Sequence, residues 1–515
     1  MVGFGGRCLG GSSSRLPAGA VAPPAVSRFL RIAIAALSAT IQALNVALAQ
    51  EEVQELYAKA QSAQAAGDLS TAAGSYEEIV LLLPDLAEAH ANLGSIYYQI
   101  GDDRKAVSSL EKAIDLKPNL AAPYFFLGVI ARRQNDHARS IQYLESYSRI
   151  DPANSIVPVY LGEAYYATGR YPAAASEFWK SASNSDFRPD AHYFLSRVYS
   201  KLAEEALERL AAEHPGSFFV KLALGHFHEG RRNWKEAEKA YGEAQRLRPD
   251  AEGLEARLTW IGSAEARGSP PLNRPPLRKG NLSLLELLYN PPSGREIDSL
   301  LEASRKRLAA SGEAATGQEA MYEQVQEYQV ASYLAARWIG ENDRGSYRAR
   351  LLRAQLHELR GEADEAVSEY RAALRLRPGL QEVHFAIGTL LWSLSRLDEA
   401  LPELQAELRI NPNHPEAHYE IADILQVLGR REEAKAHLVQ AIRFAPQMVA
   451  AHLALERIYF AEGRLEEGLR HLEDAARLDP ADPAPHYRMA TVYRRLGRAE
   501  ESQRALAEFQ RLQRE

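Results

Sequence analysis

Residues 87–120 read AEAHANLGSIYYQIGDDRKAVSSLEKAIDLKPNL, and this stretch decides the fold. Leu93, Gly94 and Tyr97 fall at i, i+1 and i+4, which places them on one face of a first helix. A second helical face carries apolar residues at i, i+4 and i+7, namely Ala106, Leu110 and Ala113. Gly101 lies between the two faces and can adopt the left-handed conformation that ends a helix. The stretch therefore predicts a helical hairpin.

The same pattern recurs along the chain with a step of 34 residues. Glycines occupy the turn between the two helices at Gly67, Gly169, Gly361, Gly429, Gly463 and Gly497. Prolines cannot continue a helix, and they close the units at Pro84, Pro118, Pro152, Pro215, Pro249, Pro378, Pro412, Pro446 and Pro480. Each hairpin leaves one apolar flank exposed, so it is stable only when stacked on its neighbours. We predict an all-α solenoid of about eleven stacked hairpins in two arrays.

The coincident spacing of glycine, alanine and proline resembles that of the tetratricopeptide repeat family. The resemblance covers nearly all of residues 53–252 and 347–515. It implies a right-handed superhelix of antiparallel helix pairs, with a concave groove that binds peptides or protein segments. It also implies that the first helix of each unit lines this groove.

The groove positions implied by the resemblance hold aromatic and arginine residues, the side chains most often found at binding hot spots. In the first array these residues are Tyr98, Phe125, Arg132 and Tyr166. In the second array they are Phe385, Trp392, Tyr419, Phe460, Tyr487 and Arg494. We expect about half of the rings to pack on the next first helix as well. We place binding mainly in the second array, because residues 347–515 form consecutive full units whose fixed register lowers the ordering cost of an extended ligand.

The first 49 residues differ in kind from the rest, because they contain arginine but no Asp, Glu or Lys. An apolar run from Ile32 ends in Ala47-Leu48-Ala49, the small-x-small pattern of a signal peptidase site. We predict a signal peptide over residues 1–49, and export to the periplasm or the extracellular space. An uncleaved N-terminal membrane anchor is the alternative, since the run is about long enough to span a bilayer. Cleavage would also remove Cys8, the only cysteine, which suits an oxidising compartment.

Beyond the signal peptide, we predict an N-terminal array over residues 50–252 and a C-terminal array over residues 319–515. Between them, residues 253–318 contain several Pro-Pro pairs, which indicates a linker with irregular helices. One short helix is expected near Leu282–Tyr289.

A second regularity appears when the chain is shifted by 129 residues, because residues 191–249 then align without gaps on residues 320–378. The coincident residues include Tyr193/Tyr322, Tyr199/Tyr328, Gly216/Gly345, Ser217/Ser346, Glu229/Glu358 and Tyr241/Tyr370. We interpret the two segments as a duplicated joint. Each copy is expected to begin with a compressed unit, about five residues short between its helix landmarks, followed by a full repeat.

Histidine recurs at the fourth position of six units, at His90, His192, His384, His418, His452 and His486. Equivalent residues of stacked units lie about 8–10 Å apart, which is too far for two imidazoles to share one zinc ion easily. No Asp, Glu or Cys recurs beside these histidines to complete a coordination shell. We therefore expect a structural role, in which the position holds a flat and partly buried ring, and no metal site.

Composition and motifs exclude several classes of function. The chain has 61 Lys+Arg against 68 Asp+Glu, which is atypical of a nucleic-acid binder. It lacks a phosphate-binding loop, a His-Glu-x-x-His motif and a Gly-x-Ser-x-Gly elbow, so we expect no catalytic residues and no cofactor. We predict an exported, non-catalytic scaffold that binds extended segments of partner proteins, with no membrane span in the mature chain. The alternative is a glycan-binding or regulatory subunit of an envelope or exopolysaccharide enzyme complex.

Overall fold

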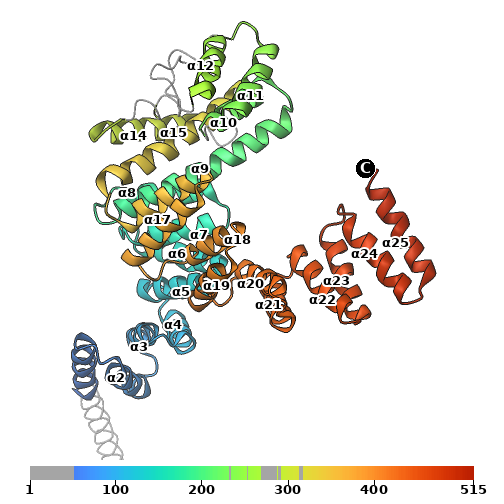
Figure 1. Cartoon of the computed structure of the whole chain (residues 1–515). Helices are drawn as coiled ribbons and strands as arrows, with labels where there is room; N and C mark the ends of the chain where they lie inside the picture. Colours follow the sequence, from blue (N-terminus) through green and yellow to red (C-terminus); the bar gives the residue numbers. More distant parts are fainter. Residues whose placement is uncertain are drawn as a thin grey trace, which may run out of the picture. The chain divides into compact units, whose positions relative to one another are not determined.

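A computed structural model of the chain describes residues 51–230, 233–251, 253–267, 287, 292–311 and 317–514. Over these residues the secondary structure is helical, with short turns and no strand (Figure 1). The predicted all-α class of stacked hairpins is confirmed. The signal peptide predicted for residues 1–49 lies outside the described residues. The chain divides into two compact units, Met1–Ala164 and Tyr165–Glu515.

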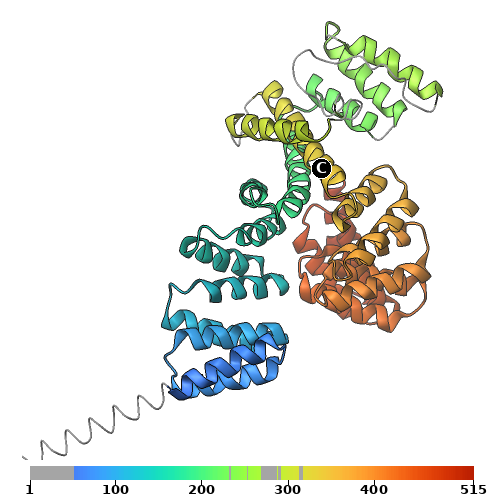
Figure 2. The same ribbon diagram turned by 90° about the vertical axis from the view of Figure 1, so that its left-hand side faces the viewer.

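The first unit is built from antiparallel helix pairs. Residues 51–65 are helical, and they are followed by α2 (Leu69–Leu82), α3 (Ala87–Ile100), α4 (Asp103–Leu116), α5 (Ala121–Arg133), α6 (His137–Ile150) and the start of α7 (Val157–Ala167). Figure 2 shows these hairpins following one another in the blue-to-cyan part of the ribbon. Within the hairpins, α3 packs on α4 and α5 packs on α6. Contacts of α5 with α4 and with α3 stack one hairpin on the next.

Local sequence explains where these helices begin and end. Gly101 ends α3 in the left-handed region, with φ of 91°. The Asp102 side chain then accepts a hydrogen bond from the amide of Lys105 (3.1 Å), which caps the N-terminus of α4. Asp68 and Asp136 cap α2 and α6 in the same way. Because these three aspartates are spaced by one repeat, the second helix begins at the same position in each of the three repeats.

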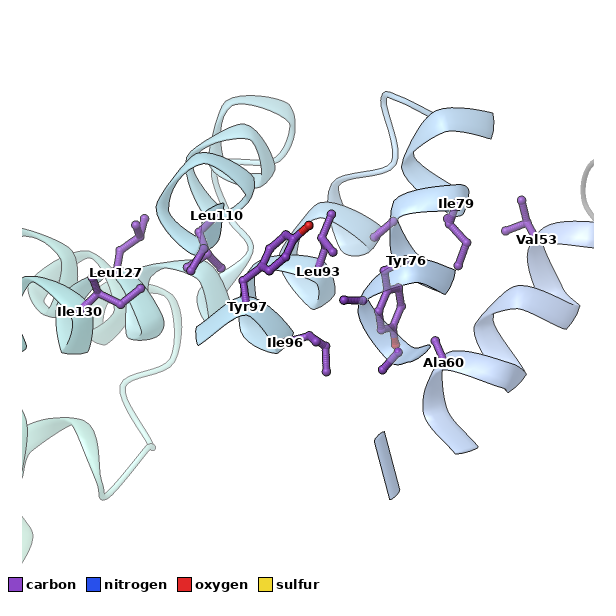
Figure 3. Packing of buried hydrophobic residues seen from close by; sticks show 14 residues of the cluster. Val53, Ala60, Tyr76, Ile79, Leu93, Ile96, Tyr97, Leu110, Leu127 and Ile130 are labelled. Carbon is purple, nitrogen blue, oxygen red and sulfur yellow. The ribbon is translucent and has the colours of Figure 1, made fainter. Parts of the chain in front are cut away.

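The core of the first unit lies between the hairpins. It contains the buried residues Val53, Tyr76, Ile79, Leu93, Ile96, Leu110, Leu127 and Ile130 (Figure 3). The two helices of a hairpin approach closely at a glycine. A Cβ atom on Gly94 would lie 2.5 Å from Cγ of Leu110, and one on Gly128 would lie 2.7 Å from Cγ of Leu144. Only glycine therefore fits these positions without a shift of the facing leucine.

The second unit has two parts, of which the second is a row of regular hairpins. Its N-terminal part comprises α8 (Tyr171–Ala182), α9 (Arg188–Glu213), α10 (Phe218–Gly230), α11 (Trp234–Leu247), α12 (Leu254–Arg267), α14 (Arg295–Ser311) and α15 (Gln318–Asn342). Its C-terminal part comprises five hairpins, α16 (Tyr347–Leu359) with α17 (Ala363–Leu376), α18 (Val383–Ser393) with α19 (Leu397–Ile410), α20 (Pro415–Val427) with α21 (Arg431–Phe444), α22 (Val449–Ala461) with α23 (Leu465–Leu478), and α24 (Ala484–Arg495) with α25 (Ala499–Leu512).

The two copies of the expected joint have the same local fold, but its first part differs from the prediction. In place of a compressed unit, each copy begins with one continuous helix, α9 of 26 residues and α15 of 25 residues. The residues by which this repeat falls short of full length are those of the turn. Without a turn glycine, the two helices of the repeat join into one. Each long helix is followed by a regular hairpin, α10 with α11 and α16 with α17.

The long helices pack along each other although about 130 residues separate them in the sequence. Tyr199 and Tyr328, which are equivalent in the two copies, stack with their ring centroids 6.2 Å apart. At the start of α9, Asp190 forms an ion pair of 2.5 Å with Arg348 of α16. The contact joins the C-terminal hairpins to helices that precede the Pro-rich segment.

The array limits at residues 252 and 319 remain a prediction. The division into compact units is a different boundary, and it lies between Ala164 and Tyr165. The short helix expected near Leu282–Tyr289 lies outside the described residues, apart from Leu287. That residue is buried, and its carbonyl oxygen accepts a hydrogen bond from the Tyr333 hydroxyl (3.1 Å).

Candidate binding surface

The first helices of the C-terminal hairpins carry six residues that sequence analysis assigned to a groove. We define the helix A surface as Phe385 and Trp392 on α18, Tyr419 on α20, Phe460 on α22, and Tyr487 and Arg494 on α24. All six therefore come from equivalent helices of consecutive hairpins.

Trp392, Tyr487 and Arg494 are exposed to solvent. The relative accessibility is 38% for Trp392 and 54% for Tyr487, which is high for large aromatic side chains. The Tyr487 ring also contacts Phe509 of α25, with centroids 5.2 Å apart. Both rings can therefore contact a ligand, and that of Tyr487, which Phe509 already holds, would lose little freedom on binding.

The other three aromatic residues of the helix A surface are partly buried. Phe385 packs against the imidazole of His414 in the next hairpin, with ring centroids 4.6 Å apart. The guanidinium of Arg495 lies 4.8 Å from the centroid of Phe460. Burial and the carboxylate of Asp423 raise the pKa of Tyr419, so its hydroxyl stays neutral. The contacts of Phe385 and Phe460 join neighbouring hairpins, and each of the three side chains keeps part of its surface exposed to solvent.

Charge is distributed unevenly along the same helices. Exposed or partly exposed carboxylates gather at α18 and α20, at Glu382, Glu416, Glu420 and Asp423. Exposed guanidinium groups gather at α22 and α24, at Arg457, Arg494 and Arg495. The surface is therefore acidic at its α18–α20 end and basic at its α22–α24 end.

Sequence analysis missed the aliphatic residues of this surface. Leu359 and Val427 are the last residues of α16 and α20, and their relative accessibilities are 55% and 67%. Leu394 and Leu428 follow α18 and α20 and are exposed as well. An aliphatic residue at the end of the first helix recurs in the aligned repeats, and this recurrence could have identified them from the sequence.

In the first unit, the predicted residues make contacts between neighbouring hairpins. Tyr98 packs on Phe126, with centroids 5.4 Å apart, and Phe125 packs on Tyr160 at 5.6 Å. Arg132 forms a 2.9 Å ion pair with Glu163. The structure thus gives Tyr98, Phe125 and Arg132 a packing role, and their contact with a ligand remains a prediction.

Tyr166 belongs to the second unit. There it contacts the ring of Tyr171 at 5.5 Å and the guanidinium of Arg197 at 4.9 Å. It is partly buried, and its contact with a ligand also remains a prediction.

The repeated histidines have partners that sequence analysis did not find. Nδ1 of His418 lies 3.0 Å from Nδ1 of His437, and Nδ1 of His452 lies 3.1 Å from Nδ1 of His471. His384 pairs with Glu403 in the same way, at 2.7 Å. The expectation that no ligand-type side chain accompanies these histidines was wrong, because the partner comes from the second helix of the same hairpin, 19 residues further on. That constant spacing was visible in the sequence.

A cavity of about 800 Å³ lies in the second unit among α8, α9, α14 and α15. Trp179, Tyr199 and Tyr328 form its aromatic wall, while Arg209 and Arg305 contribute positive charge. The indole N–H of Trp179 donates a hydrogen bond to the Tyr199 hydroxyl (2.8 Å). Four helices from distant parts of the sequence build this cavity, so no local motif predicts it.

Three profiles of the tetratricopeptide repeat match the chain. The matched residues are 87–120 and 347–379 for the first profile, 391–458 and 459–513 for the second, and 104–155 for the third. No curated protein matches the chain.

Solved structures similar to the chain cover about a third of it. A MamA crystal structure is 16% identical, covers 31% of this chain and 94% of its own, and has a TM-score of 0.30. MamA from Desulfovibrio magneticus RS-1 is 21% identical, covers 33% and 95%, and has a TM-score of 0.31. YrrB, described as a TPR protein with an unusual peptide-binding site, is 20% identical, covers 35% and 92%, and has a TM-score of 0.31.

Among the described residues, no helix combines the length and the apolar character needed to cross a bilayer.

Proposed function

This chain belongs to the tetratricopeptide repeat family, and from that premise we propose that it is a non-catalytic scaffold that binds an extended segment of a partner protein on the helix A surface. Proteins of this family generally mediate protein–protein interactions. The observation that carries the proposal is the combination of exposed rings, such as Trp392 and Tyr487, with an acidic end and a basic end on equivalent helices.

The charge distribution defines the chemistry of the partner segment. Opposite charges meet across protein interfaces, and they fix the orientation of the bound chain. The segment should therefore carry basic residues where it meets Glu416 and Asp423, and acidic residues where it meets Arg457 and Arg494. Apolar side chains beside the basic residues of the segment would contact Trp392, which lies on α18 at the acidic end.

Selection from a displayed library of extended peptides tests this proposal. Enriched peptides should carry basic residues with an adjacent apolar side chain at one end and acidic residues at the other. Trp392→Ala should weaken their binding by roughly 30-fold, equivalent to about 2 kcal/mol, without lowering the melting temperature. Leu81→Ala is the matched control, since Leu81 on α2 is 78% accessible and lies outside the helix A surface.

Two results would contradict the proposal. One is the absence of any enriched peptide while a glycan array shows specific binding. The other is unchanged peptide affinity in Trp392→Ala.

We also propose that the protein is exported, with the apolar run that ends in Ala47-Leu48-Ala49 acting as the signal. N-terminal sequencing of the protein from its native host should then begin at Gln50. An intact segment from Arg28 to Ala49 would instead support the membrane anchor.

A further inference from the structure

Three potential metal ligands converge between α22 and α23. Nδ1 of His452 lies 3.1 Å from Nδ1 of His471 and 3.9 Å from a carboxylate oxygen of Asp474. The ligand atoms of the three residues all lie within 4.8 Å of one another. In a tetrahedral zinc site with bonds of about 2.0–2.1 Å, two ligand atoms are separated by about 3.3 Å. The 3.1 Å between the two imidazoles is close to this value, and the 3.9 Å to Asp474 is somewhat longer.

Neighbouring groups orient these ligands. Nε2 of His452 lies 3.1 Å from the carbonyl oxygen of Pro446, which can only accept a hydrogen bond. In the neutral ring Nε2 therefore carries the proton, and Nδ1 presents its lone pair towards His471. A hydrogen bond from the second ring nitrogen to a carbonyl is the usual way in which proteins orient a metal-binding histidine.

The other two ligands are held as well. The ring of Tyr459 stacks on His471, with an interplanar angle of 9°. Arg477 forms an ion pair with Oδ1 of Asp474, which leaves Oδ2 directed at His452. His471 and Asp474 are partly exposed, so water can supply a fourth ligand.

We propose that His452, His471 and Asp474 bind one divalent transition-metal ion of the Zn²⁺ type. Two imidazoles and one carboxylate are a common zinc ligand set, and both ring nitrogens can face the ion without a change in the fold. The ion would join the two helices of this hairpin and would stabilise it.

The preceding hairpin supplies a matched control within the same chain. His418 and His437 repeat the histidine pair, and Nε2 of His418 also contacts a proline carbonyl oxygen, that of Pro412, at 3.1 Å. However, the position equivalent to Asp474 holds Gln440. This hairpin has two ligands of the set, whereas the α22–α23 hairpin has three.

Glu382, Glu407 and His414 form a second cluster of potential ligands. Both carboxylate oxygens of Glu407 already accept hydrogen bonds from backbone amides at the start of α18, those of Glu382 (3.0 Å) and Phe385 (3.4 Å). That cluster is explained by capping of the helix.

The test is calorimetric titration of metal-depleted, tag-free, full-length protein with Zn²⁺, followed by Co²⁺ absorption spectroscopy. We expect one bound Zn²⁺ per chain, visible bands typical of tetrahedral Co²⁺, and a higher melting temperature with Zn²⁺. Asp474→Asn and His471→Gln should each weaken binding by at least the roughly tenfold that follows loss of an outer-shell partner. His437→Gln should bind like the unmodified protein.

A gain-of-function variant keeps the test decisive if a loss variant fails to fold. Gln440→Asp completes the ligand set in the preceding hairpin, so it should raise the stoichiometry from one Zn²⁺ to two. The proposal is overturned if unmodified protein does not bind Zn²⁺ at micromolar concentrations. It is equally overturned if Asp474→Asn binds Zn²⁺ with unchanged affinity, or if Gln440→Asp adds no second ion.

Discussion

At the scale of the residue, buried charges distinguish positions that the repeat alignment treats as equivalent. Glu229 and Glu358 coincide in the two copies of the joint, and each accepts a hydrogen bond from the equivalent tyrosine, Tyr241 (2.8 Å) or Tyr370 (2.9 Å). Burial raises the pKa of both carboxyl groups. Only Glu229 also pairs with a buried arginine, Arg257, at 3.0 Å. The two copies therefore share the tyrosine–glutamate hydrogen bond, and they differ in that an arginine also pairs with the glutamate of the first copy.

His414 provides a prediction at this scale. Its ring is buried at the N-terminus of α20, with Nε2 3.1 Å from Glu382 and Nδ1 3.2 Å from both Glu416 and the amide of Ala417. The carboxylate of Glu407 lies nearby on α19. Burial lowers the pKa of His414, but the hydrogen bonds with Glu382 and Glu416 outweigh this effect and raise the pKa to about 9.

The raised pKa makes stability depend on pH. In the unfolded chain the pKa of histidine is about 6.5, so the charged ring stabilises the fold fully below about pH 6.5, and this contribution is lost as the pH rises through 9. Since both partner carboxylates are exposed, we expect about 1–2 kcal/mol. Urea unfolding at about pH 6 and about pH 9.5 should show that His414→Asn, which retains a capping side chain, loses more stability at the lower pH, because the lost packing against Phe385 is common to both values. An equal difference at both values would contradict the prediction.

At the scale of the element, glycines in helices fall into two groups. Gly128 of α5 faces Leu144, whose Cγ would lie 2.7 Å from an added Cβ, whereas Gly74 of α2 has no atom within 4 Å of that place. The same glycine-to-alanine change should therefore have opposite effects at the two positions.

We expect Gly128→Ala to destabilise the first unit by about 1–3 kcal/mol, because the added methyl group forces Leu144 out of its packing position. Gly74→Ala should stabilise the same unit by about 0.5–1 kcal/mol, because alanine favours the helix interior. Denaturant unfolding followed by circular dichroism measures both. Stabilisation by Gly128→Ala would show that the two helices of this hairpin are free to separate.

At the scale of the whole molecule, α9 and α15 connect segments that lie far apart in the sequence. Besides the pair of Tyr199 and Tyr328, the ring of Phe219 on α10 contacts Tyr322 on α15, with centroids 5.3 Å apart. The hydroxyl of Ser332 donates a hydrogen bond to the carbonyl of Ser196 (2.7 Å). These contacts hold the two copies of the joint together without help from the backbone between them.

We therefore predict that the chain can be divided without losing this assembly. Fragments 1–267 and 292–515, produced together with an affinity tag on one of them, should purify as a complex. Arg348→Ala and Tyr328→Ala combined should release the second fragment, because they remove the ion pair with Asp190 and the stacked ring. Recovery of the tagged fragment alone from the unmodified pair would show that the covalent connection is required.

The sequence alone determined the class of fold and the family, because turn glycines and closing prolines act within one hairpin and recur with it. It also determined which residues share a first helix, such as Trp392 and Phe385 on α18. Features formed by side chains from several helices became visible only in the tertiary structure. It turned the compressed units into the long helices α9 and α15, and it formed the cavity beside Trp179. Contacts of this kind connect positions whose separation in sequence carries no period, so no local pattern could reveal them.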